Sequence, residues 1–393
     1  MGAGRLIGSA TTDDRPLVVF GQRSTTYDFG PFHPLTPRRF GPAIELMRAC
    51  GADRFIEPEP VDDAALRRLH DADYVDAVRR FSAQPGRSPE RGIGPGDVPA
   101  FAGMHEASAA VAGGSLAAVD AILGGDALHA FHPGGGLHHA MAGRASGFCV
   151  YDDVALAVAL ARDAGHRVLY LDFDVHHGDG VEALFRDDPQ VLTLSIHESG
   201  ETLFPGTGWV GDRGGANAPG TVVDLPMVAG TGDQSWLAAV EAVVPLVAEA
   251  FRPTMLVTQH GCDSHLLDPL AHLRLTTAAY RRATLLCDAI AHRWTDGRWL
   301  ATGGGGYDVY RVVPRAWALV WHAQAHVEPP ESTPAAWRAS WAVEAEAWGQ
   351  APPALSLIDP VGTATPEPPG IVAANDAVVR TILRRFEGTS GDA

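Results

Sequence analysis

Cysteine and long apolar runs are scarce in this chain of 393 residues. The four cysteines (positions 50, 149, 262 and 287) show no Cys-x-x-Cys spacing, so the sequence indicates neither a zinc knuckle nor a disulfide framework. The first residues lack the apolar run of a signal peptide, and Leu6 breaks the myristoylation pattern. No apolar stretch is expected to reach transmembrane length. These absences predict a soluble, reduced, cytoplasmic protein with no membrane partner.

Basic residues are also few. Lysine and arginine number 30 against 47 acidic residues, and the resulting net charge of −17 argues against a nucleic-acid partner. Hydrophobic residues make up 46% and charged residues 20% of the chain, which is typical of a globular protein with a large core rather than a disordered one. The sequence contains no internal repeat and no extended low-complexity segment.

Short apolar runs alternate with helical patterns along most of the chain. This alternation predicts an α/β fold: a single three-layer domain with a mostly parallel central sheet and helices on both faces. Polar clusters follow five of the runs, and in such sheets ligands bind beyond the carboxyl ends of the strands. We therefore expect these clusters to converge on one cleft. The predicted strands span residues 17–20, 127–131, 167–171, 191–196, 222–225, 255–258 and 299–301.

The composition changes after about residue 325, where proline, alanine, tryptophan and glutamate become frequent. We expect residues 1–325 to form the domain that carries the site. Residues 326–393 are expected to form a helical extension that packs on this body or lies at a subunit interface. Trp337, Trp341 and Trp348 are predicted to share one face of its first helix.

The stretch that begins at Asp172 carries five ionisable groups within eight residues. Asp172, Asp174 and His176 alternate with apolar residues, so in an extended chain their side chains point the same way. One aspartate at a strand end often caps the next helix, but that interpretation accounts for a single carboxylate. Carboxylate and imidazole together are suitable ligands for a divalent metal.

A mononuclear catalytic metal needs three protein ligands and an open position. Asp174 and His176 supply two, and Asp263 is the natural third; the competing assignment places His138 or His139 on the metal. Adjacent side chains diverge, so this histidine pair is better interpreted as acid–base machinery, which needs carboxylate partners. Asp172 and Asp179 are available for that purpose. Tyr307, which follows four glycines, is placed to direct a phenol at a substrate.

Several motifs, in order and at matching spacing over roughly residues 17–325, resemble the histone deacetylase superfamily, whose fold is arginase-like. Within it, Gly135–His139 and His265–Leu270 are similar to the bacterial acetoin-utilization deacetylases. The motifs are His138-His139, Gly147-Phe148-Cys149, Asp172-x-Asp174-x-His176-His177-Gly178-Asp179-Gly180, Phe204-Pro205-Gly206-Thr207-Gly208, Gln259-x-Gly261-x-Asp263 and Gly304-Gly305-Gly306-Tyr307.

The resemblance implies specific roles. Asp174, His176 and Asp263 would bind zinc or ferrous iron, and His139 would act as the general base, oriented by Asp179. His138, oriented by Asp172, would be protonated in the first step and would help to protonate the leaving amine.

Tyr307 would donate a hydrogen bond to the oxyanion. Phe148 and Phe204 would wall an apolar channel for an acyl-lysine stem, and Gly147 would allow its close approach. Asp97, in the loop over residues 83–100, would hold the substrate backbone at the rim. A structural potassium ion is implied at Asp172, Asp174 and His176, together with Ser195.

The resemblance thus implies a zinc-dependent hydrolase that releases acetate from Nε-acetyl-lysine in proteins or peptides. An acetylpolyamine amidohydrolase with a small amine substrate is the main alternative. A binuclear manganese ureohydrolase would need more ligands around two ions, and an acetyl-lysine binding module would not need the full catalytic set. The resemblance leaves open whether the chain forms a homo-oligomer.

Overall fold

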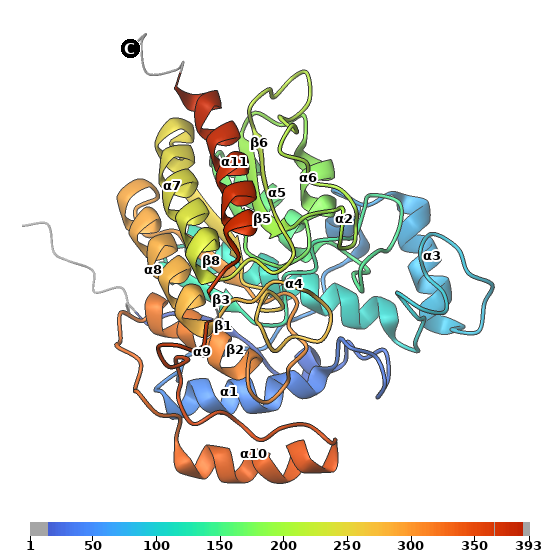
Figure 1. Ribbon diagram of the computed structural model, residues 1–393. Coiled ribbons are helices and arrows are strands. Elements are labelled where there is room, and N and C mark those ends of the chain that lie inside the picture. Colours follow the sequence, from blue (N-terminus) through green and yellow to red (C-terminus); the bar gives the residue numbers. More distant parts are fainter. Residues whose placement is uncertain (1–14, 365, 388–393) are drawn as a thin grey trace, which may run out of the picture.

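The computed structural model describes residues 15–364 and 366–387 and contains one eight-stranded sheet in the order β2-β1-β3-β8-β7-β4-β5-β6 (Figure 1). Every pair of neighbouring strands is parallel, which confirms the predicted sheet. The short edge strand β2 was not predicted. The strands are β1 (Leu17–Val19), β2 (Phe55–Ile56), β3 (His129–His132), β4 (Val168–Asp172), β5 (Val191–Glu198), β6 (Val222–Met227), β7 (Met255–Gln259) and β8 (Trp299–Thr302).

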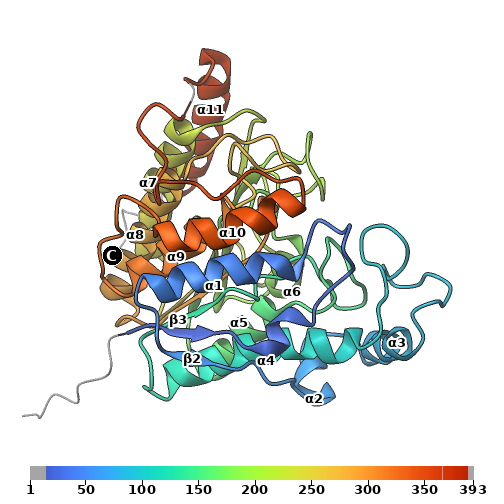
Figure 2. The ribbon, with the colours of Figure 1, turned by 90° about the horizontal axis from the view of Figure 1, so that it is seen from below.

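Helices cover both faces of the sheet, as Figure 2 shows. Helices α1, α7, α8 and α9 share one apolar cluster with the sheet, and α4, α5 and α6 share another on the opposite face. The helices are α1 (Phe40–Ala49), α2 (Asp63–Leu66), α3 (Ala72–Ala83), α4 (Met104–Leu123), α5 (Asp153–Asp163), α6 (Asp179–Phe185), α7 (Asp233–Phe251), α8 (Thr277–Trp294), α9 (Val313–Gln324), α10 (Ala335–Ala347) and α11 (Pro369–Phe386), with 3-10 turns at Gln22–Thr25 and Pro37–Arg39.

Strand β4 shows why the layers form. Leu169 and Leu171 pack into the first cluster, and Val168 and Tyr170 pack into the second. Successive side chains of a strand point to opposite faces, so a strand that is apolar on both faces must be covered on both. The continuous apolar runs of the sequence therefore correspond to buried, central strands.

Apolar residues recur at helical spacing over residues 66–81, which is typical of one helix, but in the structure α2 ends at Leu66 and α3 begins at Ala72. The buried His70 lies at the break, where its Nε2 accepts a hydrogen bond from the Asp152 amide at 3.1 Å. Its other ring nitrogen lies 3.0 Å from the Met141 carbonyl oxygen, and the Asp71 amide donates to Ala142. These contacts with distant segments end the helix where local periodicity alone would continue it.

Two helices, α4 and α7, are long and apolar enough to cross a membrane by length and composition, so the expectation that no stretch reaches that length was wrong. In the folded chain, 72% of the apolar window of α4 and 50% of that of α7 are buried. Both helices pack against the sheet, and this burial accounts for their apolar composition.

The C-terminal helices pack on the rest of the chain. Helix α10 lies along α1 (Figure 2), where the indole nitrogens of Trp337 and Trp341 donate to the Pro42 carbonyl and the Glu45 carboxylate, each at 2.8 Å. Helix α11 packs against α7 (Figure 1), and its Ile382 is completely buried. The segment beyond residue 325 is therefore continuous with the main core.

Candidate active site

The parallel sheet gathers the polar clusters at one edge. Strands β3, β4, β7 and β8 end at His132, Asp172, Gln259 and Thr302, respectively. The residues that follow these strands either line a common pocket or form hydrogen bonds with the residues that line it. Beyond β5, the loop that carries Phe204 reaches the same place, since its ring centroid lies 5.1 Å from that of His139. The predicted convergence of five strand ends is observed.

Asp174, His176 and Asp263 form a set that could hold a metal ion, with their ligand atoms within 4.8 Å of one another. His176 Nδ1 lies 3.0 Å from Asp174 Oδ1 and 3.2 Å from Asp263 Oδ2. Ligand atoms on a tetrahedral ion with bonds of about 2.0–2.1 Å lie about 3.3–3.4 Å apart. Asp263 Oδ2 is buried and accepts no hydrogen bond from the described residues, so the donor set fits a cation.

The remaining carboxylate oxygens are held by the protein. Asp174 Oδ2 accepts hydrogen bonds from Gln259 Nε2 at 2.7 Å and from the Gly305 amide at 2.8 Å, and Asp263 Oδ1 accepts one from the Val175 amide at 2.9 Å. A Cβ atom at Gly305 would lie only 2.0 Å from Asp263 Oδ2. Glycine at position 305 therefore allows the backbone after β8 to approach these carboxylates closely.

His138 and His139 lie beside this set without joining it. His138 Nδ1 donates to Asp172 Oδ2 at 2.7 Å, and His139 Nδ1 donates to Asp179 Oδ1 at 2.6 Å. Each histidine thus has its own carboxylate, as expected, and each keeps Nε2 for other chemistry. Asp172 also accepts from the Tyr170 hydroxyl at 2.7 Å, so it is committed to orienting His138.

The two imidazoles have different electrostatic surroundings, although their ring centroids are only 4.0 Å apart. Burial disfavours charge on both. For His138, the negative charges of Asp172 and Asp174 outweigh burial and raise its pKa to about 9. For His139, burial and the positive charge of His138 lower its pKa to about 4. A charged and a neutral imidazole therefore lie side by side.

The pocket walls contain the predicted aromatic residues. Gly147 (φ 53°), Phe148 and Tyr307 line the pocket with both histidines, and the rings of Phe148 and Tyr307 meet edge to face at 6.0 Å. A Cβ atom at Gly147 would lie 2.2 Å from the His139 ring, so only glycine fits there. Phe204 is not part of this lining, but its ring lies 5.1 Å from that of His139 and 45% of its surface is exposed.

Asp97 lies at the rim, where its Oδ2 accepts a hydrogen bond from the Gly147 amide at 2.7 Å. Ser195 lies opposite Asp172 in the register of β4 and β5, and its hydroxyl contacts His197 Nδ1 at 2.8 Å.

Sequence reasoning did not find several supporting residues. Asp268 Oδ2 accepts from the Tyr307 amide at 2.9 Å, and the buried Arg39 donates from Nη1 to the Gly304 carbonyl at 2.6 Å. Asp153 accepts from the amides of Gly136 and Leu137 at 3.1 and 2.8 Å, just before the histidine pair. Asp268 lies within the His265–Leu270 segment that carries the resemblance, and this context is the signal that could have indicated its role.

The other histidines of the motifs do not reach the metal set. His177 faces away, toward Glu182 Oε2 at 2.9 Å and Thr207 Oγ1 at 2.9 Å, and so ties the Phe204 loop to α6. His260 is buried, and its Nε2 lies 2.8 Å from the Thr258 hydroxyl, so it is a hydrogen-bonded interior residue.

Comparison with known proteins agrees with this geometry. Residues 33–324 match the family profile described as "Histone deacetylase domain". The chain is 40% identical over 334 residues to the acetoin utilization protein AcuC of Bacillus subtilis (strain 168). The alignment covers 83% of this chain and 86% of that protein. It is 36% identical over 331 residues to AcuC of Staphylococcus xylosus, and this alignment covers 82% of this chain and 86% of that protein.

Solved structures give the same result. An HDAC homolog from Aquifex aeolicus superposes with a TM-score of 0.79 and 26% identity, covering 93% of this chain and 99% of that one. An HDAC homolog complexed with SAHA superposes with a TM-score of 0.80 and 26% identity, covering 94% and 99%.

Proposed function

This chain belongs to the histone deacetylase family, and we propose that it is a metal-dependent amidohydrolase that removes acetyl groups from Nε-acetyl-lysine in proteins or peptides. One observation carries the proposal: Asp174, His176 and Asp263 converge beside two histidines that have separate carboxylate partners. Water adds to the acetyl carbonyl, the C–N bond breaks, and acetate and a free amine leave.

The three-residue set would hold the metal. A divalent ion bound there, zinc or ferrous iron, supplies Lewis acidity toward the acetyl carbonyl and toward water. A second ion would need more ligands, and Asp172 is already bonded to His138 and Tyr170. This argues for a mononuclear deacetylase rather than a binuclear ureohydrolase.

The histidine pair would move the protons. His139 is held by Asp179 through Nδ1, so Nε2 of its neutral ring is free to take a proton from the attacking water. His138, charged and held by Asp172, stabilises the negative charge that develops and can give its Nε2 proton to the leaving amine.

Tyr307 would stabilise the oxyanion. Burial raises the pKa of its phenol well above the usual value, so the hydroxyl remains a hydrogen-bond donor. Phe148 in the pocket lining and Phe204 beside His139 would offer apolar surface to the stem of an acyl-lysine, and Asp97, next to the Gly147 amide, would accept hydrogen bonds from a peptide backbone.

The test uses two single variants and an acetyl-lysine peptide. Tyr307→Phe should lose about 10²–10³ in kcat, the usual effect of removing one oxyanion donor. His139→Ala should lose at least as much, while circular dichroism and metal content stay unchanged. Full activity in either variant would refute the assigned roles.

The substrate class is tested separately with the unmodified chain. Values of kcat/KM for an acetyl-lysine peptide and for acetylspermidine should differ in favour of the peptide. The opposite order would make the chain an acetylpolyamine amidohydrolase with the same catalytic groups.

A further inference from the structure

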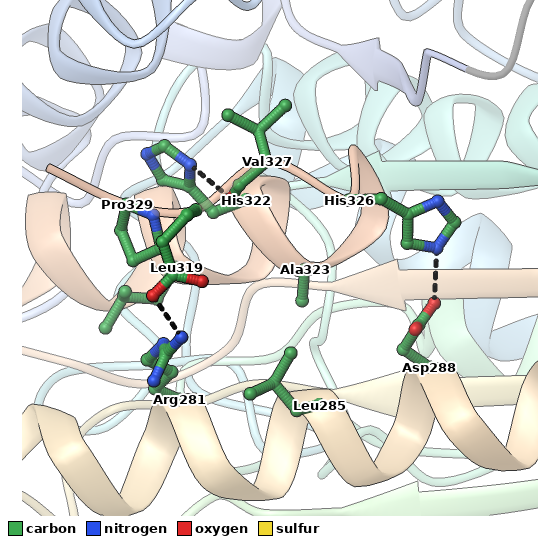
Figure 3. Close-up of a pocket in the computed structure, with 10 residues that line it drawn as sticks. Arg281, Leu285, Asp288, Leu319, His322, Ala323, His326, Val327 and Pro329 are labelled. Carbon is green, nitrogen blue, oxygen red and sulfur yellow. Dashed lines mark hydrogen bonds and ion pairs between the residues drawn. The ribbon is translucent and has the colours of Figure 1, made fainter.

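A second group of metal-ligating side chains lies at the other end of the sheet from the candidate active site. It consists of His129, Asp288, His292 and His326, whose ligand atoms all lie within 4.8 Å of one another. His129 is the first residue of β3, Asp288 and His292 are one turn apart on α8, and His326 follows α9. Figure 3 shows His326 pointing down to Asp288 on α8, beside a surface pocket.

Three of the four ligand atoms form a triangle of the right size for one ion. His326 Nε2 lies 3.0 Å from Asp288 Oδ1 and 3.2 Å from His292 Nε2, and His292 Nε2 lies 3.4 Å from Asp288 Oδ1. Four ligands on tetrahedral zinc, with bonds of about 2.0–2.1 Å, are separated by about 3.3–3.4 Å. No backbone movement is needed to bring this triangle to zinc-binding dimensions.

His129 supplies the independent observation. It is 2% exposed, and its Nδ1 donates to the Gln324 carbonyl at 2.8 Å. That bond fixes the tautomer and leaves the lone pair on Nε2, which is the arrangement found in metal-ligating histidines. Nε2 is buried and has no hydrogen-bond partner among the described residues. Its ring centroid lies 5.1 Å from that of His292 and 5.4 Å from that of His326.

Protons alone do not satisfy this arrangement. His292 Nε2 and Asp288 Oδ1 both contact His326 Nε2, which can donate to the carboxylate or accept from His292 but not both, and neither proton reaches the buried His129 nitrogen. A cation contacted by all four groups would satisfy them together. Imidazole nitrogens with one carboxylate suit zinc and its borderline neighbours better than calcium or magnesium.

We propose that His129, Asp288, His292 and His326 form a second, non-catalytic site for zinc or a similar divalent transition metal. Four protein ligands leave no open position, which is typical of a structural ion. The ion would join β3, α8 and the residue at which the chain turns from α9 toward the C-terminal helices. His326 has a left-handed backbone conformation (φ 54°), and its Nε2 contacts Asp288.

Metal analysis of the full chain tests the proposal. After loading with zinc and desalting, the unmodified protein should hold two ions per chain, whereas His326→Ala and His292→Ala should each hold one. Asp174→Ala, which removes a ligand of the candidate active site, should also hold one, and the double variant Asp174→Ala/His326→Ala should hold none. His166→Ala, outside both groups, is the matched control and should hold two.

The metal can also be observed at the new site alone. In Asp174→Ala, added cobalt should produce the visible absorption of a tetrahedral ion and raise the unfolding temperature, and neither change should occur in the double variant. Deacetylation by His326→Ala should stay within twofold of the unmodified chain. An Asp174→Ala protein that binds no ion, or a His326→Ala protein that keeps two, would overturn the proposal.

The two hypotheses fail in different ways. If the second site is wrong but the proposed function is right, the unmodified chain holds one ion and Asp174→Ala loses it. If the second site is right and the catalytic metal is wrong, the single ion disappears in His326→Ala and remains in Asp174→Ala.

Discussion

Replacing Asp359 with asparagine should destabilise the whole chain, because this carboxylate joins the C-terminal segment to the main core. Its Oδ1 accepts from Arg315 Nη1 at 2.7 Å. Its Oδ2 accepts from His265 Nε2 and from the amide and hydroxyl of Thr277, each at 2.9 Å. The side chain of Arg315 is 1% exposed and that of Asp359 is 11% exposed, so water cannot replace these partners.

The magnitude follows from the burial of Arg315. Breaking a buried ion pair by removing one partner costs about 3–5 kcal/mol, since the other charge stays uncompensated. A typical domain has a free energy of unfolding of only about 5–15 kcal/mol. Asp359→Asn should therefore lower the urea midpoint markedly. Glu241→Gln, which breaks the exposed pair with Arg282, is the control and should change stability by at most about 1 kcal/mol.

The pH dependence provides a second measurement. Burial opposes ionisation of Asp359, but the hydrogen bond from His265 and the charge of Arg315 hold its pKa well below the usual range. A carboxyl whose pKa is lower in the folded state stabilises the protein above its unfolded pKa, about 3.9, and loses that effect as the pH falls below it.

Urea unfolding at pH 7 and near pH 3 should therefore show a large difference between the unmodified chain and Asp359→Asn that shrinks in acid. A variant within about 1 kcal/mol of the unmodified chain at pH 7 would refute the reasoning. So would a difference that is unchanged at low pH.

Three further substitutions test the candidate active site. Gly305→Ala should abolish metal binding there without unfolding, because its Cβ would lie 2.0 Å from Asp263 Oδ2; Gly370→Ala, which has open space, is the control, and equal metal content in both would contradict the geometry. Asp268→Ala should lower kcat with little change in KM, since the Tyr307 amide loses its acceptor at a cost of about 1–3 kcal/mol; an unchanged kcat would show that Tyr307 holds its position without it. Phe204→Ala should raise KM for an acetyl-lysine peptide and leave stability within about 0.5 kcal/mol, because its half-exposed ring contributes little to the core. Thermal unfolding and steady-state kinetics separate these effects, and an unchanged KM would exclude Phe204 from substrate contact.

The order of strands and helices could be predicted because this fold buries its strands on both faces. Runs such as Val168–Leu171 are apolar at every position, and helical patterns lie between most of these runs, which indicates a layered parallel sheet. The break at His70 could not be predicted, because its partners at Met141 and Asp152 lie more than 70 residues away in the chain. The two-residue strand β2 is too short to produce a pattern.

The candidate site was predictable where residues lie close together in the sequence. Asp174 and His176 are two residues apart. Asp263 could be added because it follows another predicted strand, and the carboxyl ends of parallel strands meet at one edge of the sheet. Other contacts could not be predicted because they join residues that are far apart in the sequence. Asp268 accepts a hydrogen bond from the Tyr307 amide, and Asp359 contacts His265. His292 has its neighbours His129 and His326 far away in the sequence, so only the folded chain reveals the cluster.

The half-exposed ring of Phe204 has a thermodynamic consequence for any ligand that enters the pocket. Until a ligand stem covers it, part of this wall faces water, and covering it removes apolar surface from solvent. Burial of apolar surface gives binding a negative heat-capacity change. In titration calorimetry, the binding enthalpy should therefore fall more steeply with temperature for long-stemmed ligands than for acetate. The difference between the two slopes measures how much apolar surface, including that of Phe204, the ligand stem covers.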